Sequence, residues 1–194
     1  MRELSLHILD LVQNAIEAGA TKVSLEIIEE RQNKNTLLIR VEDNGRGMEE
    51  ATLKRVTDPF VTSRNTRRIG LGLSLIHMST QMCEGYLNIV SDLGRGTMVE
   101  ALYKHSHIDR PPMGNIAETI RSIIIGNPEL NFSYSHRVDR KKFSLTTQEM
   151  IEILGDIPLT EPMVLVWLQE YLGDNLMNLY DIKNLHGGAS SENN

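Results

Sequence analysis

The chain has 194 residues, a net charge of −6, 40% apolar and 24% charged residues, and one cysteine. This composition is typical of a soluble globular protein, and the negative charge argues against nucleic acid as a partner. A lone Cys83 excludes an internal disulfide, and no apolar run reaches the roughly 20 residues of a membrane span. Because the N-terminus opens with charged residues and does not resemble a signal peptide, we expect a cytoplasmic protein that does not bind a membrane.

The first 104 residues alternate helical and strand patterns. Apolar residues recur every three or four positions from Leu4 to Ala15, which predicts a helix that Gly19 ends. Two alternating segments are joined by a short polar linker and should form an antiparallel hairpin. The predicted elements are a helix over 3–18, strands over 21–30 and 36–44, helices over 49–56 and 71–83, and strands over 86–92 and 96–103. This half is therefore expected to be α+β.

The second half differs from the first in charge. Residues 1–104 carry 13 basic and 14 acidic side chains, whereas residues 105–194 carry 7 and 12. We predict a first domain over 1–104, a linker over 105–113, a small α+β unit over 114–182 and a disordered tail over 183–194. The small unit has the pattern of a helix, a β-hairpin and two helices, of which the last should end at Gly173. It matches no catalytic motif, so we expect a role in recognition or dimerisation.

Three short segments of the first half carry residues suited to chemistry. Asp10 and Asn14 are one helical turn apart, and this pair suits a metal or water site as well as a solvated helix face. The segment DNGRG at 43–47 ends a strand, where two glycines allow either a simple turn or a close approach to a ligand. The segment GLG at 70–72 precedes a helix and could expose N–H groups to an anion. Each segment alone is weak evidence for function.

The joint order of these segments resembles the GHKL ATPase superfamily, which groups DNA gyrase, the large heat-shock chaperone, sensor histidine kinases and mismatch-repair ATPases. "DLVQNAIEAGA" looks like the N box, "DNGRGM" the first glycine box, "DPFVTS" the F box, "GLGLSL" the second glycine box and "GRGT" the third. The resemblance covers about residues 1–104. It implies a Bergerat-type two-layer α/β sandwich, with a mixed, mainly antiparallel sheet covered by helices and a lid over the nucleotide.

The resemblance assigns roles to particular residues. Asn14 would ligate a Mg²⁺ that bridges the phosphates, Asp43 would accept a hydrogen bond from the adenine amino group, and Thr97 would support Asp43 through water. The segment 62–68 would be the lid. The full set of residues that the resemblance places at ATP is Asn14, Asp43, Gly45, Gly47, Met48, Phe60, Thr62, Arg64, Gly70, Leu71, Gly72, Leu73 and Thr97.

The position four residues before Asn14 bears on catalysis. Members of the superfamily that hydrolyse ATP or phosphorylate serine usually carry Glu there, and sensor histidine kinases more often carry Asn. Asp10 has a carboxylate like Glu, on a side chain shorter by one methylene group. It therefore favours hydrolysis or Ser/Thr phosphorylation, in which Asp10 would act as the general base. The lid looks most like that of histidine kinases. The chain begins at the N-box helix without an upstream hairpin for a phosphoacceptor histidine, and His7 is expected to be structural, which favours a kinase that acts on another protein, as anti-sigma-factor kinases do.

We therefore expect a Mg²⁺-dependent ATP-binding protein that transfers the γ-phosphoryl group to a partner protein or hydrolyses ATP as a switch. The alternative is a non-catalytic module that senses nucleotide. The expected partners are ATP or ADP, a protein target or partner subunit, and a second copy of the chain as a homodimer. A mismatch-repair role is disfavoured because the second half of the chain, residues 105–194, is short and acidic.

Two features of the second half have a structural interpretation. The residues His105, His107, Asp109 and His136 match no standard metal-site spacing, so we expect surface histidines on a linker. The stripe from Met163 to Leu168 that contains Trp167 is expected to belong to the core.

Overall fold

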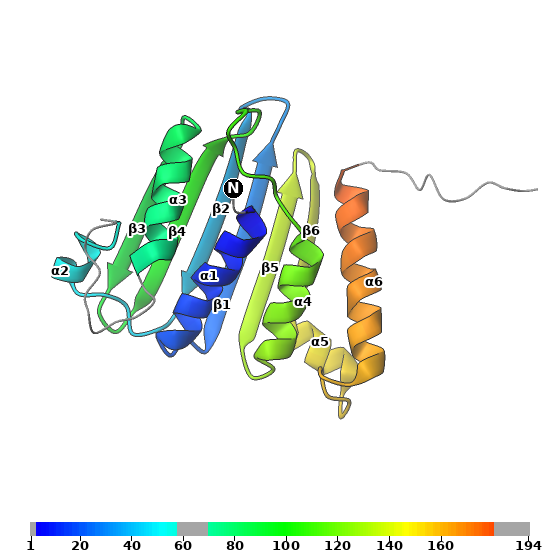
Figure 1. Cartoon of the computed structure of the whole chain (residues 1–194). Coiled ribbons are helices and arrows are strands. Elements are labelled where there is room, and N and C mark those ends of the chain that lie inside the picture. The colour runs from blue at the N-terminus through cyan, green and yellow to red at the C-terminus, as the bar shows by residue number, and fades with distance from the viewer. Residues whose placement is uncertain (1–2, 58–69, 181–194) are drawn as a thin grey trace, which may run out of the picture.

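The structure is a computed structural model that describes residues 3–57 and 70–180 (Figure 1). It has two layers: a six-stranded sheet, and helices packed on one of its faces. The strands are β1 (Lys22–Glu30), β2 (Thr36–Asp43), β3 (Tyr86–Asp92), β4 (Gly96–Lys104), β5 (Asn131–Val138) and β6 (Lys141–Thr146). The helices are α1 (Leu4–Glu17), α2 (Glu50–Leu53), α3 (Gly70–Met82), α4 (Ile116–Gly126), α5 (Thr147–Leu154) and α6 (Pro162–Leu179).

The strand order is β3-β4-β2-β1-β5-β6. The pair β1 and β5 is parallel, and the other neighbouring pairs are antiparallel. This arrangement confirms the predicted α+β class with a mixed, mainly antiparallel sheet. It also shows that β5 and β6 extend the sheet formed by β1–β4, so the residues on both sides of the expected linker share one sheet and one core. The division of the chain at 105–113 into folding units stays a prediction.

The alternation of side chains explains which face of the sheet is covered. In β1, Val23, Leu25 and Ile27 are buried under the helices, whereas Glu26 on the opposite face pairs with Arg40 at 3.0 Å. Apolar and charged residues therefore separate at period two, as expected for a sheet with one solvated face. The core lies between the sheet and α1, α3, α4 and α6.

Two expectations about α6 are wrong. The helix does not end at Gly173, because Leu172 and Leu179 continue the buried face that Val164 and Leu168 begin. A glycine inside a helix costs only about 1 kcal/mol relative to alanine, which tertiary packing can outweigh. The stripe around Trp167 is only half core, because Trp167 is 42% exposed.

The other predicted elements are confirmed within a few residues. The strands over 21–30 and 36–44 pair as an antiparallel hairpin, and α1 ends before Gly19, which has a φ of +79°. None of the helices in 3–57 and 70–180 is both long and apolar enough to cross a membrane.

Candidate functional site

A cavity of about 90 Å³ lies between α1, α3 and the adjoining ends of β2 and β4. Its apolar walls come from Leu11 and Ala15 of α1, Val41 of β2 and Val99 of β4. The predicted site residues that line it are Asn14, Asp43, Gly47, Met48, Leu73 and Thr97. The fold thus brings together residues separated by more than 80 positions in sequence, and the cavity combines apolar walls with a few polar groups, as small-molecule sites do.

Asp43 provides a carboxylate in this cavity. It is the last residue of β2, where it pairs with Thr97 at the start of β4. Its Oδ1 accepts a hydrogen bond of 2.7 Å from the backbone N–H of Gly45. Burial raises the pKa of the Asp43 carboxyl, and the N–H groups of Gly45 and Thr97 offset this only in part. The fold therefore keeps a half-buried acceptor at the strand end, although its ionised form is disfavoured there.

The turn after Asp43 is fixed by close backbone contacts. Gly47 has a φ of +65°, and a Cβ at this position would lie 2.0 Å from the carbonyl oxygen of Asp92. No other residue type fits there without moving the backbone, which explains the glycine. Asn44 holds the start of the turn, because its Oδ1 accepts hydrogen bonds from the N–H groups of Thr21 and Lys22 at 2.9 and 2.8 Å.

Ser91, which was not among the predicted site residues, supports two residues of the cavity wall, Met48 and Thr97. Its Oγ accepts a 2.9 Å hydrogen bond from the N–H of Met48 and lies 2.9 Å from Oγ1 of Thr97. It also donates to the carbonyl of Gly96 at 3.0 Å. Ser91 follows Leu87 and Ile89 on the inward face of β3, so an inward serine in a strand pattern was the signal that could have identified it.

Asp10 lies next to the first turn of α3. A Cβ placed on Gly72 would be 3.8 Å from Oδ2 of Asp10, so the carboxylate is close to the start of that helix. Asn14, one turn further along α1, lines the cavity. The predicted pair therefore sits between the cavity and the N-terminus of α3, where N–H groups favour negatively charged ligands.

Some of the predicted site residues lie outside the residues that the structure describes, and others lie at their edge or next to the cavity. Phe60, Thr62 and Arg64, and with them the predicted lid, fall outside the described residues. Gly70 is the first residue of α3, and the side chain of Leu71 is not described. Gly45 is buried beside Ala18, where a Cβ would lie 3.0 Å from the Ala18 Cβ.

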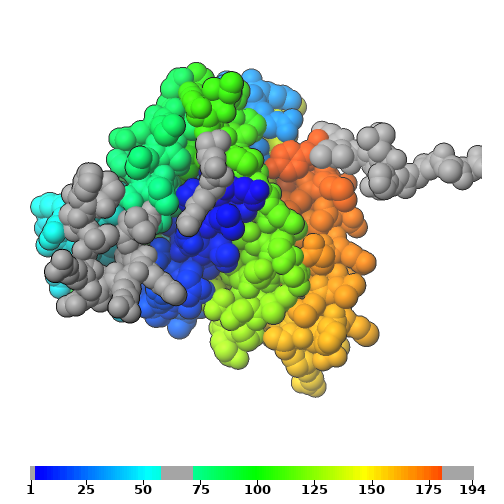
Figure 2. Space-filling view, in the orientation of Figure 1, coloured from blue at the N-terminus to red at the C-terminus, as the bar shows by residue number. Residues whose placement is uncertain are grey.

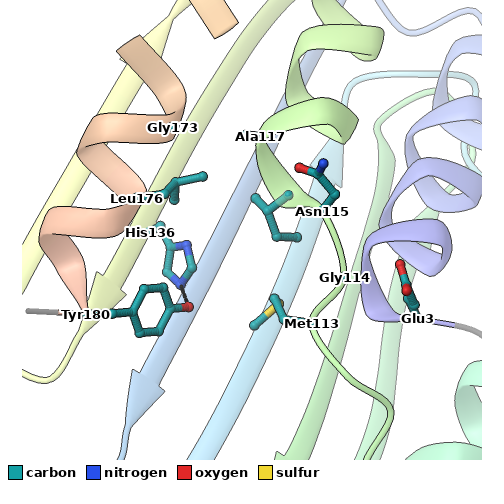
Figure 3. A pocket seen from close by; sticks show the side chains of 10 residues that line it. Glu3, Met113, Gly114, Asn115, Ala117, His136, Gly173, Leu176 and Tyr180 are labelled. Atoms are coloured by element: carbon teal, nitrogen blue, oxygen red, sulfur yellow. Dashed lines mark hydrogen bonds between the residues drawn. The ribbon is translucent and has the colours of Figure 1, made fainter. Parts of the chain in front are cut away.

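A second, larger hollow of about 560 Å³ lies between α1, α4 and α6 (Figure 3). His136 and Tyr180 form one wall, and Met113 and Asn115 lie across from them. Both polar groups of that wall are engaged within the protein. The Nε2 of His136 lies 2.9 Å from Oε1 of Glu29, and the hydroxyl of Tyr180 donates to the same oxygen.

Glu29 is the centre of a buried polar cluster. Its Oε2 lies 2.7 Å from Nε2 of His105, and Nδ1 of His136 lies 2.9 Å from the hydroxyl of Tyr134. Burial would raise the pKa of Glu29, but hydrogen bonds from His136, Tyr180 and His105 outweigh it and lower the pKa to about 2. An ionised carboxylate only accepts, so Nε2 of both histidines carries a hydrogen.

The expectation of surface histidines on a linker is wrong for His136. It lies in β5 and is 1% exposed, because its position continues the inward alternation of Phe132 and Tyr134. Within the described part of the chain, no cluster of three or more His, Cys, Asp or Glu side chains is arranged to hold a metal ion.

Comparisons with known proteins identify the family. Residues 2–107 match the family described as "Histidine kinase-, DNA gyrase B-, and HSP90-like ATPase". This match covers more than half of the chain, so the chain belongs to that family, which confirms the predicted superfamily. ATP binding is the function that this membership implies.

Proteins that resemble the chain in sequence include sensor proteins. A protein described as a sensor in Shewanella frigidimarina is 36% identical over 103 residues, which are 53% of this chain and 16% of that protein. The autoinducer 2 sensor kinase/phosphatase LuxQ of Vibrio cholerae is 32% identical over 110 residues, covering 53% of this chain and 13% of LuxQ. The chain thus spans less than a fifth of the length of these relatives.

A solved structure supports the fold. The N-terminal domain of a DNA repair protein superposes with a TM-score of 0.55 at 16% identity, covering 75% of this chain and 53% of that one. At this identity the likeness concerns the fold alone.

Proposed function

We propose that the protein is a Mg²⁺-dependent ATP-binding protein that transfers the γ-phosphoryl group of ATP to a partner protein, or hydrolyses ATP to switch a partner. The observation that carries the proposal is the cavity in which the Asp43 carboxylate and Asn14 lie among apolar walls. The flat base of a nucleotide fits between such walls, and an exocyclic amino group can donate to the carboxylate.

The base end of the proposed site would select adenine. A half-buried carboxylate accepts hydrogen bonds and cannot donate them when ionised, so it matches the amino group of adenine. The carbonyl oxygen of guanine at the same position would face a second acceptor without a hydrogen between them. Ser91 and Thr97 connect the strands behind Asp43 and keep the carboxylate at the strand end.

The phosphate end would lie at the start of α3. The N–H groups of Gly70 and Gly72 are in the first turn of a 13-residue helix, where the helix dipole favours anions. Asp10 beside Gly72 would be repelled by phosphate unless a cation lay between them. This arrangement favours binding of ATP together with its metal.

The donor atoms here fit Mg²⁺. The ion prefers oxygen ligands and is commonly held by one or two side chains together with substrate phosphates, so the Asn14 carboxamide oxygen suffices as the protein ligand. When bound, Mg²⁺ would neutralise phosphate charge during transfer. We propose Asn14 as its ligand.

Asp10 is proposed as the general base. Its carboxylate would accept the proton of the attacking hydroxyl or water. The attacking oxygen would then bond to the γ-phosphorus, the bond from this phosphorus to the bridging oxygen would break, and ADP would leave. One observation supports the alternative function, a nucleotide sensor without turnover. The side chain of Asp10 is shorter than that of the Glu usual in hydrolysing members.

The variant Asp10→Asn tests catalysis. We expect ATP affinity to change less than about threefold and turnover to fall at least about 100-fold. Both are measured by calorimetric titration and by single-turnover release or transfer of labelled phosphate, with the exposed Asp156→Asn as the control. Turnover that is unchanged in Asp10→Asn removes Asp10 from the mechanism, and absence of product in the natural protein with every tested partner supports the sensor.

A further inference from the structure

The side of α6 that faces away from the sheet carries large apolar side chains exposed to solvent. Met163, Val166 and Trp167 follow one another at helical spacing and are 79%, 61% and 42% exposed. On the same side, the helix continues with Glu170, Asp174 and Met177. We call these six residues the outer face of α6. Large apolar side chains exposed next to one another are characteristic of interaction sites.

Trp167 is held in place by its neighbours. Its ring stacks on that of Tyr171 at 4.9 Å between centroids, and Tyr171 meets the buried Phe143 edge-on at 5.6 Å. The tryptophan is therefore supported from the core and has little side-chain entropy left to lose on binding. Supported aromatic side chains are the residues that contribute most to protein interfaces.

The charged residues of the outer face, Glu170 and Asp174, are both acidic, although the base Lys141 lies near the end of α6, where its Nζ donates to the carbonyl of Asn178 at 2.9 Å. Residues 143–180 contain six carboxylates and no Lys, Arg or His; the carboxylates are Glu149, Glu152, Asp156, Glu161, Glu170 and Asp174. Within the described residues, none of the six forms an ion pair. Elsewhere in the same structure, carboxylates do pair with bases, as in Glu26 with Arg40 and Glu118 with Arg121. A partner with basic groups would supply the missing counter-charges.

The outer face of α6 lies at one end of the molecule (Figure 2). Helix α6 packs on the edge strand β6, whereas Asp43 and Thr97 of the proposed nucleotide site belong to β2 and β4 on the other side of β1 and β5. In Figure 2, α4 separates α6 from α1 on the surface. A macromolecule can therefore occupy the outer face of α6 without covering the nucleotide cavity.

We propose that the outer face of α6 binds a basic amphipathic helix of a partner protein. Its apolar side chains would contact Met163, Val166 and Trp167, and its lysines or arginines would pair with Glu170 and Asp174. A single convex helix offers ridges and no deep groove, so a second helix is the element that packs on it best. A second copy of this chain fits less well, because a two-fold contact through this face would bring the Glu170 and Asp174 carboxylates of the two copies close to one another.

The test uses a fluorescein-labelled peptide of about 18 residues, long enough for a helix, with leucines on one helical face and lysines elsewhere. We expect the natural protein, without nucleotide, to bind it with a Kd of about 10 µM or tighter by fluorescence anisotropy. A matched peptide with glutamates in place of the lysines should not bind below roughly 1 mM. Because no nucleotide is present, failure here does not affect the proposed ATP site.

Three variants locate the binding. The double variant Met163→Ser/Val166→Ser should weaken binding of the lysine peptide at least about tenfold. The double variant Glu170→Lys/Asp174→Lys should no longer bind the lysine peptide and should bind the glutamate peptide instead. Ile108→Ser, which removes a side chain 92% exposed outside this face, is the control and should bind normally. Unchanged thermal midpoints confirm folding. The proposal is overturned if the natural protein does not bind the lysine peptide, if the charge reversal leaves peptide preference unchanged, or if light scattering shows a dimer that Met163→Ser/Val166→Ser dissociates.

Discussion

Two carboxylates on the helix-covered face of one hairpin have pKa values shifted in opposite directions. Glu29 in β1 and Asp43 in β2 both continue an inward alternation, and they lie at opposite ends of the hairpin, opposite Leu37 and Val23 respectively. The pKa of Glu29 is lowered to about 2 and that of Asp43 is raised. Burial acts in the same direction on both, so the hydrogen-bond donors around each carboxylate make the difference.

The difference separates a structural carboxylate from one suited to a ligand. Glu29 accepts from His136, Tyr180 and His105, which join β1 to β5, to the end of α6 and to the segment after β4. Asp43 accepts from Gly45 and retains acceptor capacity toward a cavity. A carboxylate that the fold keeps half-buried with incomplete protein donors is a good candidate for ligand recognition.

Removing the charge of Glu29 should have the largest effect on folding. We expect Glu29→Gln to lower the free energy of unfolding by about 3 kcal/mol, because three donors would share one neutral acceptor and face an added NH₂ group. The loss is measured by urea denaturation. ATP affinity should stay within about twofold, since Glu29 is not in the nucleotide cavity.

Glu26→Gln is the matched control for Glu29. Its carboxylate pairs with Arg40 on the solvated face, so its loss should cost less than about 1 kcal/mol. Equal losses for the two variants would remove the distinction between the buried cluster and an ordinary surface pair.

Removing the charge of Asp43 should have its main effect on binding. We expect Asp43→Asn to weaken ATP binding at least about 100-fold, because the anionic acceptor for adenine is lost. Since its pKa is raised in the folded state, ionised Asp43 opposes folding at neutral pH, and this cost disappears as the pH falls through the folded pKa. The unliganded variant should therefore be as stable as the natural protein or more so, which thermal unfolding at pH 7 tests. A marked loss of stability would mean that Asp43 is structural.

The turn after Asp43 contributes to stability through one close backbone contact. Gly47 and Gly94 both have positive φ, but a Cβ on Gly47 would lie 2.0 Å from the carbonyl oxygen of Asp92, whereas nothing lies within 4 Å of one on Gly94. We expect Gly94→Ala to cost about 1 kcal/mol and Gly47→Ala about 2 kcal/mol more. Chemical denaturation of both variants measures this, and similar costs would contradict the close contact.

The stabilisation by Glu29 should depend on pH in the acid range. Because the pKa of Glu29 is lowered from 4.5 to about 2, its stabilisation is complete above pH 4.5 and is lost as the pH falls toward 2. The difference in unfolding free energy between the natural protein and Glu29→Gln should therefore narrow between about pH 5 and pH 3. A constant difference over that range would mean that Glu29 is not ionised in the fold.

The sequence predicted the cavity around Asp43 better than the cluster around Glu29. Asp43, Gly47 and Thr97 belong to short motifs that resemble those of the GHKL superfamily, and this resemblance implied that they meet. The pairing of β1 with β5 joins residues more than 100 positions apart, and no local pattern determines which strand edge receives β5.

The Glu29 cluster could not be predicted for the same reason. A glutamate at the end of one strand and His136 in another approach each other only after the parallel pair has formed. One signal was present, since His136 stands at an inward position of an alternating strand and therefore had to be buried with a partner. The exposure of Trp167 could not be predicted either, because it depends on where α6 packs.

We propose that Asp43 makes the cavity an adenine site. Calorimetric titration of the natural protein with Mg²⁺–ATP and with Mg²⁺–GTP tests it most directly, since the two nucleotides differ in the base and share the phosphates. We predict binding of ATP with a Kd in the micromolar range and binding of GTP at least about 100-fold weaker. Equal affinity for the two nucleotides, or no binding of ATP, would contradict the account.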